Sequence, residues 1–238
     1  MPECKLKFSD NRIRVGTPGD YQPYSYWNAQ SGQFEGVDIE MALQLGKELG
    51  VEVQFVRFRW PDLVDDLLAD RFDIAMGGIT RDLIRARDVA FTDSCLTYGT
   101  CPLVRRGDGD RYGSLDAIDG ADVRVVLNQG GSNDKYFSGI LKNATVIRHP
   151  RNDEIASLVV SGAADVWLTD NVEALFWEKQ FPELRAVNPM DTLTVGTKGY
   201  LIRQGNQSFL NWLNLWLEQM RLQGEIARIE KNWLNGII

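Results

Sequence analysis

The segment VRVVLNQGGSNDK, residues 123–135, joins an apolar run typical of a buried strand to the start of a predicted helix. Its two glycines, Gly130 and Gly131, let the backbone approach a ligand closely. Free N–H groups at the start of a helix, together with the helix dipole, favour a negatively charged group, and Ser132 and Asn133 add side-chain donors. The segment therefore predicts either a site for a carboxylate or small phosphate, or a simple strand–helix turn with Ser132 as the N-cap.

Strands and helices alternate on both sides of this segment. Before it, the apolar patterning predicts strands at Ile13–Thr17, Val51–Phe58 and Phe72–Met76 and helices at Val37–Leu49 and Pro61–Leu68. From it onward, the patterning predicts helices at Asn133–Leu141, Asn152–Ser161 and Asn171–Gln180 and strands at Thr145–Arg148 and Asp165–Thr169. This order is typical of the α/β class, in which helices cover parallel sheets.

The chain divides at the loop Arg106–Asp110, which follows a predicted strand at Gly99–Arg105. A strand at Tyr200–Arg203 and a final helix end the sequence, and the helix carries an apolar stripe of Phe209, Trp212, Leu213, Trp216, Leu217 and Met220. A stripe of this kind favours core packing on the first lobe over a membrane surface. We expect one lobe of residues 1–105 plus 200–238 and a second of residues 106–199, joined by a hinge.

The composition argues against several classes of function. The 238 residues carry a net charge of −7 that is spread along the chain, whereas binding of nucleic acid requires a basic face. No apolar run is long enough to span a bilayer, so we expect no membrane insertion. The three cysteines and the single histidine, His149, form neither a metal-ligand pattern nor a catalytic triad, and no cofactor is expected. Cys95 and Cys101 either pair in an oxidising compartment or remain small buried residues.

Ligands of α/β sheets bind beyond the carboxyl ends of the strands, so the residues after each predicted strand are candidates. After the third predicted strand, Gly78 offers free backbone groups, Thr80 offers a hydroxyl, and Arg85 follows five residues later. Together they could form a fork for a planar carboxylate. Alternatively, Arg85 and its neighbouring arginines are all solvated. Tyr21 and Trp60 lie on loops after the first two strands, where aromatic rings either line a pocket or pack locally.

Glu173 follows the last strand of the second series. Thr169 or Asp170 with an acid near the third helical position fits a helix-capping pattern. The chemical alternative requires Glu173 to face a ligand cleft, where desolvation would raise its pKa and keep it protonated as a proton donor.

With these residues taken together, the chain resembles the family 3 solute-binding proteins, the polar amino-acid receptors of bacterial transporters. The resemblance rests on GVDIEMA at 36–42, on DIAMGGIT at 73–80, and on Arg85 followed by FTD at 91–93. It implies a type II periplasmic-binding-protein fold, with the ligand cleft between two lobes. By position, Tyr21 and Trp60 would flank the ligand, and Gly78, Thr80 and Arg85 would hold a carboxylate. Asp170 lies where many receptors hold the α-amino group of the ligand.

Within that superfamily the chain resembles the cyclohexadienyl dehydratases. The similar segments are Gly19-Asp20-Tyr21 with Pro23, Asn128 with Gly130-Gly131-Ser132-Asn133 and Lys135, His149-Pro150 with Asn152, and Thr169-Asp170 with Glu173-Ala174. This resemblance implies a lyase that converts prephenate to phenylpyruvate, or arogenate to phenylalanine, with Glu173 as the general acid. The region Asn128–Asn133 would hold or orient a second carboxylate.

The alternative is a non-catalytic amino-acid receptor, whose partner would be the permease of an ABC transporter. Either function implies a small carboxylate-bearing ligand and a periplasmic or secreted protein. Because Met1-Pro2-Glu3-Cys4-Lys5 is not a secretory signal, that location would require a signal removed upstream of this sequence; otherwise the protein is cytosolic.

Overall fold

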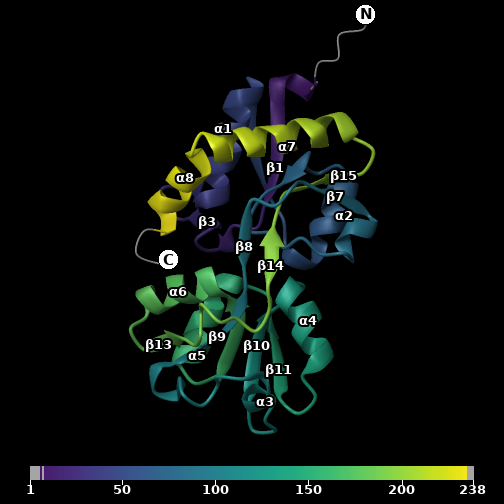
Figure 1. Ribbon diagram of the computed structural model, residues 1–238. Helices are drawn as coiled ribbons and strands as arrows, with labels where there is room; N and C mark the ends of the chain where they lie inside the picture. The colour runs from purple at the N-terminus through teal and green to yellow at the C-terminus, as the bar shows by residue number, and fades with distance from the viewer. Residues whose placement is uncertain (1–5, 7, 235–238) are drawn as a thin grey trace, which may run out of the picture. The chain divides into compact units, whose positions relative to one another are not determined.

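The computed structural model describes residues 6 and 8–234 and contains two compact α/β units. The first comprises the described residues up to Gly19 together with Tyr24–Leu96 and Thr197–Trp233, and the second comprises Asp20–Pro23, Thr97–Gly196 and Leu234. The chain passes between the units within β8 (Leu96–Tyr98) and β14 (Gly196–Lys198), and the short β2 (Asp20–Tyr21) belongs to the second unit (Figure 1).

The first unit is built on a five-stranded sheet in the order β5-β1-β6-β15-β7. Strand β1 is parallel to β5 and β6, whereas β15 is antiparallel to β6 and β7. The strands of the first unit are β1 (Arg12–Thr17), β3 (Ser25–Asn28), β4 (Gln33–Glu35), β5 (Glu52–Arg57), β6 (Ile74–Ala75), β7 (Val89–Phe91) and β15 (Leu201–Arg203). Its helices are α1 (Val37–Leu49), α2 (Leu63–Leu68), α7 (Gln207–Leu222) and α8 (Glu225–Leu234, of which Leu234 falls in the second unit), with short 3-10 turns at Ser9–Asn11, Trp60–Asp62 and Arg85–Arg87.

The second unit repeats this strand pattern in the order β11-β10-β12-β9-β13. Strand β10 is parallel to β11 and β12, β9 is antiparallel to β12, and β13 is antiparallel to β9. The strands are β9 (Thr100–Arg105), β10 (Arg124–Asn128), β11 (Thr145–His149), β12 (Val166–Asp170) and β13 (Leu184–Ala186). The helices are α3 (Leu115–Ile118), α4 (Ser132–Ile140), α5 (Ile155–Val160) and α6 (Asn171–Gln180), with 3-10 turns at Arg106–Asp108 and Asn152–Glu154.

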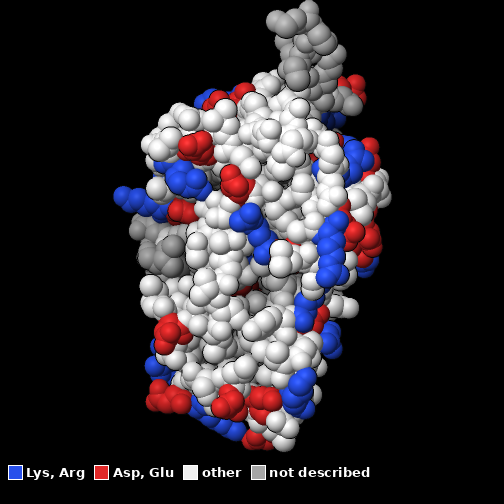
Figure 2. Space-filling model, turned by 45° about the vertical axis from the view of Figure 1, so that its right-hand side comes forward, with Lys and Arg blue, Asp and Glu red and all other residues white. Residues whose placement is uncertain are grey.

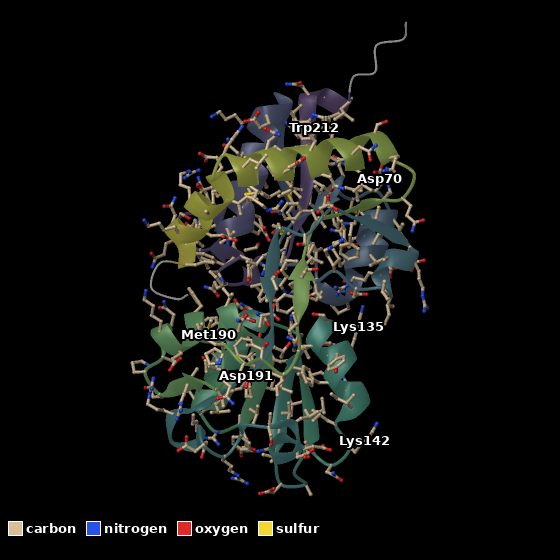
Figure 3. All side chains as sticks on the ribbon, viewed as in Figure 1. Asp70, Lys135, Lys142, Met190, Asp191 and Trp212 are labelled. Carbon is tan, nitrogen blue, oxygen red and sulfur yellow. The ribbon has the colours of Figure 1, made fainter. Side chains whose placement is uncertain are left out.

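Apolar side chains fill both faces of the second sheet. On one face Trp167, Ala174 and Trp177 pack with β9 and α5, and on the other Leu127, Phe137 and Leu168 pack against α4. In the first unit, helix α7 buries the stripe formed by Phe209, Leu213, Trp216, Leu217 and Met220, while Trp212 lies on the same helix and is half-buried (Figure 3).

The α/β fold class predicted from the sequence is confirmed. Strand β9, which the sequence division placed at the end of the first lobe, hydrogen-bonds to β12 and β13 of the second sheet. Strands β7, β13 and β14 were not predicted, and each has three residues. Strands this short carry no usable periodicity, so their existence depends on partners far along the chain.

An arginine–aspartate clamp joins neighbouring strands at the amino end of each sheet. Asp73, just before β6, accepts hydrogen bonds from the backbone and guanidinium of Arg14 on β1. Asp165, just before β12, accepts the same set from Arg124 on β10. Burial opposes ionisation of Asp165, but the hydrogen bonds from Arg124 and Arg105 outweigh it and lower its pKa to about 2.

Candidate functional site

Glu173 lies in a buried polar cluster at the carboxyl end of the second sheet. It is the third residue of α6 and is 1% exposed. Its carboxylate accepts hydrogen bonds from the amide of Asn152 and from the hydroxyl of Thr169. The N-cap residue of α6, Asp170, makes no side-chain capping bond. The side chain of Glu173 is therefore directed to a polar cluster rather than serving only to cap its helix.

Asn152 and Asp20 hold one side of this cluster. The side-chain amide of Asn152 also donates to the backbone carbonyl of Asp20 at 3.3 Å, and its backbone N–H donates to the Asp20 carboxylate at 3.2 Å. Both residues are buried. Asn152 opens the 3-10 turn that follows β11, so its position depends on the strand order of the second sheet. Sequence reasoning assigned no role to either residue, although both occur in the motifs on which the resemblance rests.

Asp170 brings together two more of the predicted ligand-binding residues. One carboxylate oxygen accepts from the phenol of Tyr21 and the other accepts from the side-chain amide of Asn133 at 3.3 Å. The amide oxygen of Asn133 in turn accepts from Thr100 at 2.9 Å. The second unit thus places Tyr21, Asn133, Asp170 and Glu173 on one connected end of its sheet.

In the turn from β10 to α4, the backbone N–H groups of Gly130 and Gly131 donate hydrogen bonds to residues of the same segment. Gly130 has a φ of 76°, in the region that favours glycine, and its N–H donates to the Asp134 carboxylate at 3.0 Å. The N–H of Gly131 donates to the Asn128 carbonyl at 3.0 Å. These two N–H groups would reach an anion only after giving up those bonds.

The same turn begins α4 with Gly131 as its N-cap, and this cap makes no side-chain hydrogen bond. Ser132 is therefore not the N-cap, contrary to the simpler of the two sequence interpretations. Among the described residues, the buried amide oxygen of Asn128 has no hydrogen-bond partner. An orphan acceptor of this kind calls for an explanation, and a ligand donor would satisfy it. Lys135 projects from the exposed side of α4 (Figure 3).

Arg85 is the buried member of the arginine group in the first unit. It is 3% exposed, whereas Arg81 and Arg87 are exposed. Its guanidinium lies 3.1 Å from the carboxylate of Asp82 and donates to the Thr80 carbonyl at 3.4 Å. These contacts fix the guanidinium next to Thr80, as a carboxylate fork requires.

The glycine turn after β6 rests on a buried acid. Gly78 has a φ of 69°, and its N–H donates to the carboxylate of Asp38, which also accepts from the phenol of Tyr200 at 3.0 Å. Burial raises the pKa of Asp38, although the bond from Gly78 opposes that rise. Gly78 is therefore positioned by Asp38, and its N–H is engaged within the unit.

Lys198 was missed by sequence reasoning, because the stretch that contains it was not predicted to be a strand. It ends β14, is 3% exposed, and its ammonium donates to the hydroxyl of Thr80 at 3.2 Å. The ammonium also lies 5.7 Å from the centre of the Tyr24 ring.

Trp60 is buried, with its ring edge-on to Phe58 at a centroid distance of 5.6 Å.

Cys95 and Cys101 are both free thiols. Burial raises the pKa of each, which makes the reactive thiolate scarce.

The described residues contain no cluster of three or more His, Cys, Asp or Glu that could hold a metal ion. No helix in the described part of the chain is both long and apolar enough to cross a bilayer.

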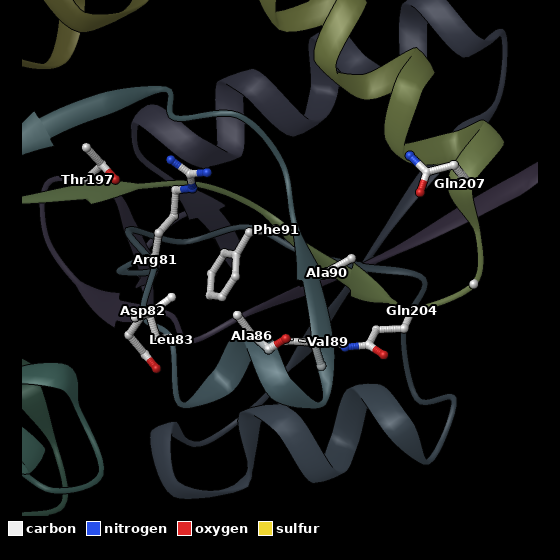
Figure 4. A pocket seen from close by; sticks show the side chains of 11 residues that line it. Arg81, Asp82, Leu83, Ala86, Val89, Ala90, Phe91, Thr197, Gln204 and Gln207 are labelled. Atoms are coloured by element: carbon white, nitrogen blue, oxygen red, sulfur yellow. Dashed lines mark hydrogen bonds between the residues drawn. The ribbon is translucent and has the colours of Figure 1, made fainter.

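A surface pocket of about 670 Å³ lies in the first unit, beside the loop that carries Arg85. Its lining includes Arg81, Asp82, Leu83, Phe91 and Gln204, and the Phe91 ring points into the middle of these side chains (Figure 4). None of the predicted ligand-binding residues lines it.

Basic and acidic side chains are interspersed over the visible face of the molecule rather than gathered by sign (Figure 2).

Residues 13–236 match the family described as bacterial extracellular solute-binding proteins, family 3. The chain belongs to this family. The two α/β units are accordingly the lobes of a periplasmic-binding-protein fold, and the family resemblance recognised in the sequence is confirmed.

Named relatives include an enzyme and a binding protein. A cyclohexadienyl dehydratase of Pseudomonas aeruginosa is 35% identical over 222 residues, covering 93% of this chain and 82% of the relative. A variant of an ancestral cyclohexadienyl dehydratase is 46% identical, with a TM-score of 0.58 over 94% of this chain and 92% of that one. An ancestral amino acid-binding protein, described as a precursor of cyclohexadienyl dehydratase, is 32% identical, with a TM-score of 0.88 over 94% and 96% of the two chains.

Proposed function

We propose that this protein is a lyase of the cyclohexadienyl dehydratase type, acting on prephenate or arogenate, with Glu173 as the general acid. The observation that carries the proposal is the buried hydrogen-bonded setting of the Glu173 carboxyl between Asn152 and Thr169. A helix cap needs neither a buried amide partner nor 1% exposure. The similarity to a named dehydratase over 93% of this chain supports the same reaction.

The reaction needs one proton and two anchored carboxylates. The bond from the ring to its carboxylate breaks and releases CO2, and its electron pair enters the ring. The ring becomes aromatic as the C4 hydroxyl departs, and the proton from Glu173 makes that leaving group water. Glu173 then regains a proton from solvent. No oxidant or reductant is consumed, and proton donation by a positioned acid contributes roughly 10²–10⁴-fold in rate.

The other residues would hold the substrate in place for this step. Arg85 and Thr80 of the first unit would bind one carboxylate, with Gly78 shaping the turn, and Tyr21 and Trp60 would flank the ring. Asn128, Ser132 and Asn133 would contact the other end of the substrate, close to the glycine turn of residues 130 and 131. Asn152 and Thr169 are positioning residues, because they orient the carboxyl of Glu173.

Incubation with prephenate, following phenylpyruvate formation, tests the proposal when wild type and Glu173→Gln are compared. The glutamine keeps the shape and hydrogen-bonding capacity of the side chain but cannot deliver a proton, so turnover should fall roughly 10²–10⁴-fold while folding and substrate binding persist. Glu178→Gln is the matched control, since it makes the same change on the same helix, where Glu178 pairs with Arg106. Equal activity of Glu173→Gln and wild type would refute the role of Glu173.

The second candidate is a non-catalytic amino-acid receptor that delivers its ligand to an ABC transporter permease. It is favoured by the 32% identity to an ancestral amino acid-binding protein over 94% of this chain. In that case Asp170 would bind the α-amino group, after exchanging its bonds from Tyr21 and Asn133. Absence of turnover in wild type, combined with tight calorimetric binding of an amino acid, would select this function. A periplasmic or secreted location accords with either function.

A further inference from the structure

Strand β7 (Val89–Phe91) is an edge of the first sheet. It comes last in the strand order, and its neighbour in the sheet is β15. The register of the two strands extends to Thr92, whose N–H donates to the Tyr200 carbonyl at 2.9 Å. Because hydrogen-bonded residues alternate along an antiparallel pair, the backbone N–H and C=O groups of Val89 and Phe91 point away from β15.

These outward groups are not used by the loops around the strand. Among the described residues, no turn, loop or cap bond between backbone groups involves Val89 or Phe91. Unpaired backbone groups on an edge are a template for a further strand. Because β7 has only three residues, backbone pairing alone would not select a partner, and recognition would depend on the side chains beside the edge.

The surface pocket of about 670 Å³ lies along this edge, and all three residues of β7 line it. Its lining also includes Thr197, which precedes β15 in the chain, and Gln204, which follows it. The lining therefore extends along the strand pair (Figure 4). A hollow of this kind beside an open strand fits an extended peptide, which adds to a sheet through its backbone and places alternate side chains in pockets.

The pocket combines apolar side chains with a cation. Leu83 is 88% exposed, and the ring of Phe91 points into the middle of the lining (Figure 4). Arg81 is exposed, and among the described residues only its backbone N–H is hydrogen-bonded. The acidic side chain of the lining, Asp82, is instead paired with Arg85 at 3.1 Å. An occupant with apolar side chains and a negative charge would complement this surface.

We propose that the edge of β7 binds an extended acidic peptide segment of another protein as an added strand. The peptide backbone would pair with the outward N–H and C=O groups of Val89 and Phe91. Alternate apolar side chains of the peptide would contact Leu83 and the Phe91 ring, and a carboxylate side chain would reach the guanidinium of Arg81. The pocket contains none of the residues assigned to the ligand, so this inference does not depend on the proposed function.

The probe is a display library of seven-residue peptides that is panned on the wild-type protein. Selected sequences should alternate apolar residues and carry Asp or Glu near one end. The best peptide, resynthesised, should bind Arg81→Gln about two- to fivefold more weakly than wild type, which is the range expected for an exposed ion pair. Arg87→Gln is the matched control and should bind as wild type does, since Arg87 is also exposed but does not line the pocket.

Methylation of single peptide amides distinguishes strand addition from simple burial in the pocket. In an added strand the N–H groups of alternate residues face the edge, so N-methylation of those amides should weaken binding about three- to tenfold. Methylation of the intervening amides should leave the affinity close to that of the parent peptide. Equal losses at every amide, or a library that yields no acidic binder, would overturn the proposal. A wild-type dimer in sedimentation velocity that the selected peptide dissociates would assign the edge to a second copy of this chain, and would overturn it as well.

Discussion

The amino ends of the two sheets are built alike, whereas their carboxyl ends bury different sets of charged residues. At the amino ends, Arg14 and Asp73 in the first unit repeat the bonds of Arg124 and Asp165 in the second. At the carboxyl ends, the first unit buries Arg85 and Lys198 around Thr80 together with the acid Asp38, and the second buries the acids Asp20, Asp170 and Glu173. The comparison teaches that the two units share the arginine–aspartate clamp and differ in the buried charged residues at the other end of the sheet.

The acidic end is held by neutral donors rather than by bases in the contacts described within its own unit. Asn152 and Thr169 donate to Glu173, and Tyr21 and Asn133 donate to Asp170. Hydrogen bonds donated to a carboxylate favour its charged form, and these neutral donors provide them without the positive charge of an arginine.

Among the substitutions considered, Arg85→Ala at the carboxyl end of the first sheet should have the largest effect, which is a loss of ligand affinity. This change removes a buried guanidinium next to Thr80, so binding of phenylpyruvate should weaken by about 2–4 kcal/mol. Titration calorimetry measures the change directly. Arg87→Ala, an exposed neighbour on the same turn, is the control and should bind as wild type does. Unchanged affinity in Arg85→Ala would place the carboxylate elsewhere.

A smaller effect, on stability alone, is expected at the shared end. The folded-state pKa of Asp165 is lowered to about 2 from a usual value of 3.8, so its contribution of about 2 kcal/mol is present above pH 4 and is lost as pH falls toward 2. Asp165→Asn should lower the free energy of unfolding by about that amount at pH 7, measured by urea denaturation. The variant should also lose less stability than wild type between pH 4 and pH 2. An equal acid sensitivity of the two proteins would show that the clamp does not depend on ionisation.

The smallest effect is expected for an exposed ion pair at the edge of the first sheet. Arg12 and Glu52 lie 3.2 Å apart, with 41% and 69% of their side chains exposed. Arg12→Gln should change the free energy of unfolding by less than about 1 kcal/mol, because water and salt screen such pairs. A loss as large as that of Asp165→Asn would remove the distinction between the buried clamp and ordinary surface pairing.

Sequence patterning predicted the long elements because each carries its own signal. The periodic apolar residues of α1 and the buried run of β10 are local properties, and both are present in the structure. The three-residue strand β7, which was not predicted, instead exists through pairing with β15 across more than a hundred residues. No local window contains that information.

The candidate site was predictable only in part, for a similar reason. Glu173 was recognisable as a candidate, but its position in α6 fits capping as well as chemistry, and the choice depends on Asn152 from a different element. The clamps of Asp73 and Asp165 and the buried Lys198 also depend on partners distant in sequence. Periodicity describes which face of an element is buried, and it does not identify what a polar side chain meets there.

The strand order has a consequence for synthesis of the chain on the ribosome. All five strands of the second sheet lie between Thr100 and Ala186, and Asp20–Pro23, which belongs to the same unit, is made before them. The first sheet remains in two pieces until β15, near the end of the chain, inserts between β6 and β7. The sheet whose strands appear second can therefore be completed first. Until residue 203 emerges, the incomplete first sheet leaves the edges of β6 and β7 unpaired and in need of protection.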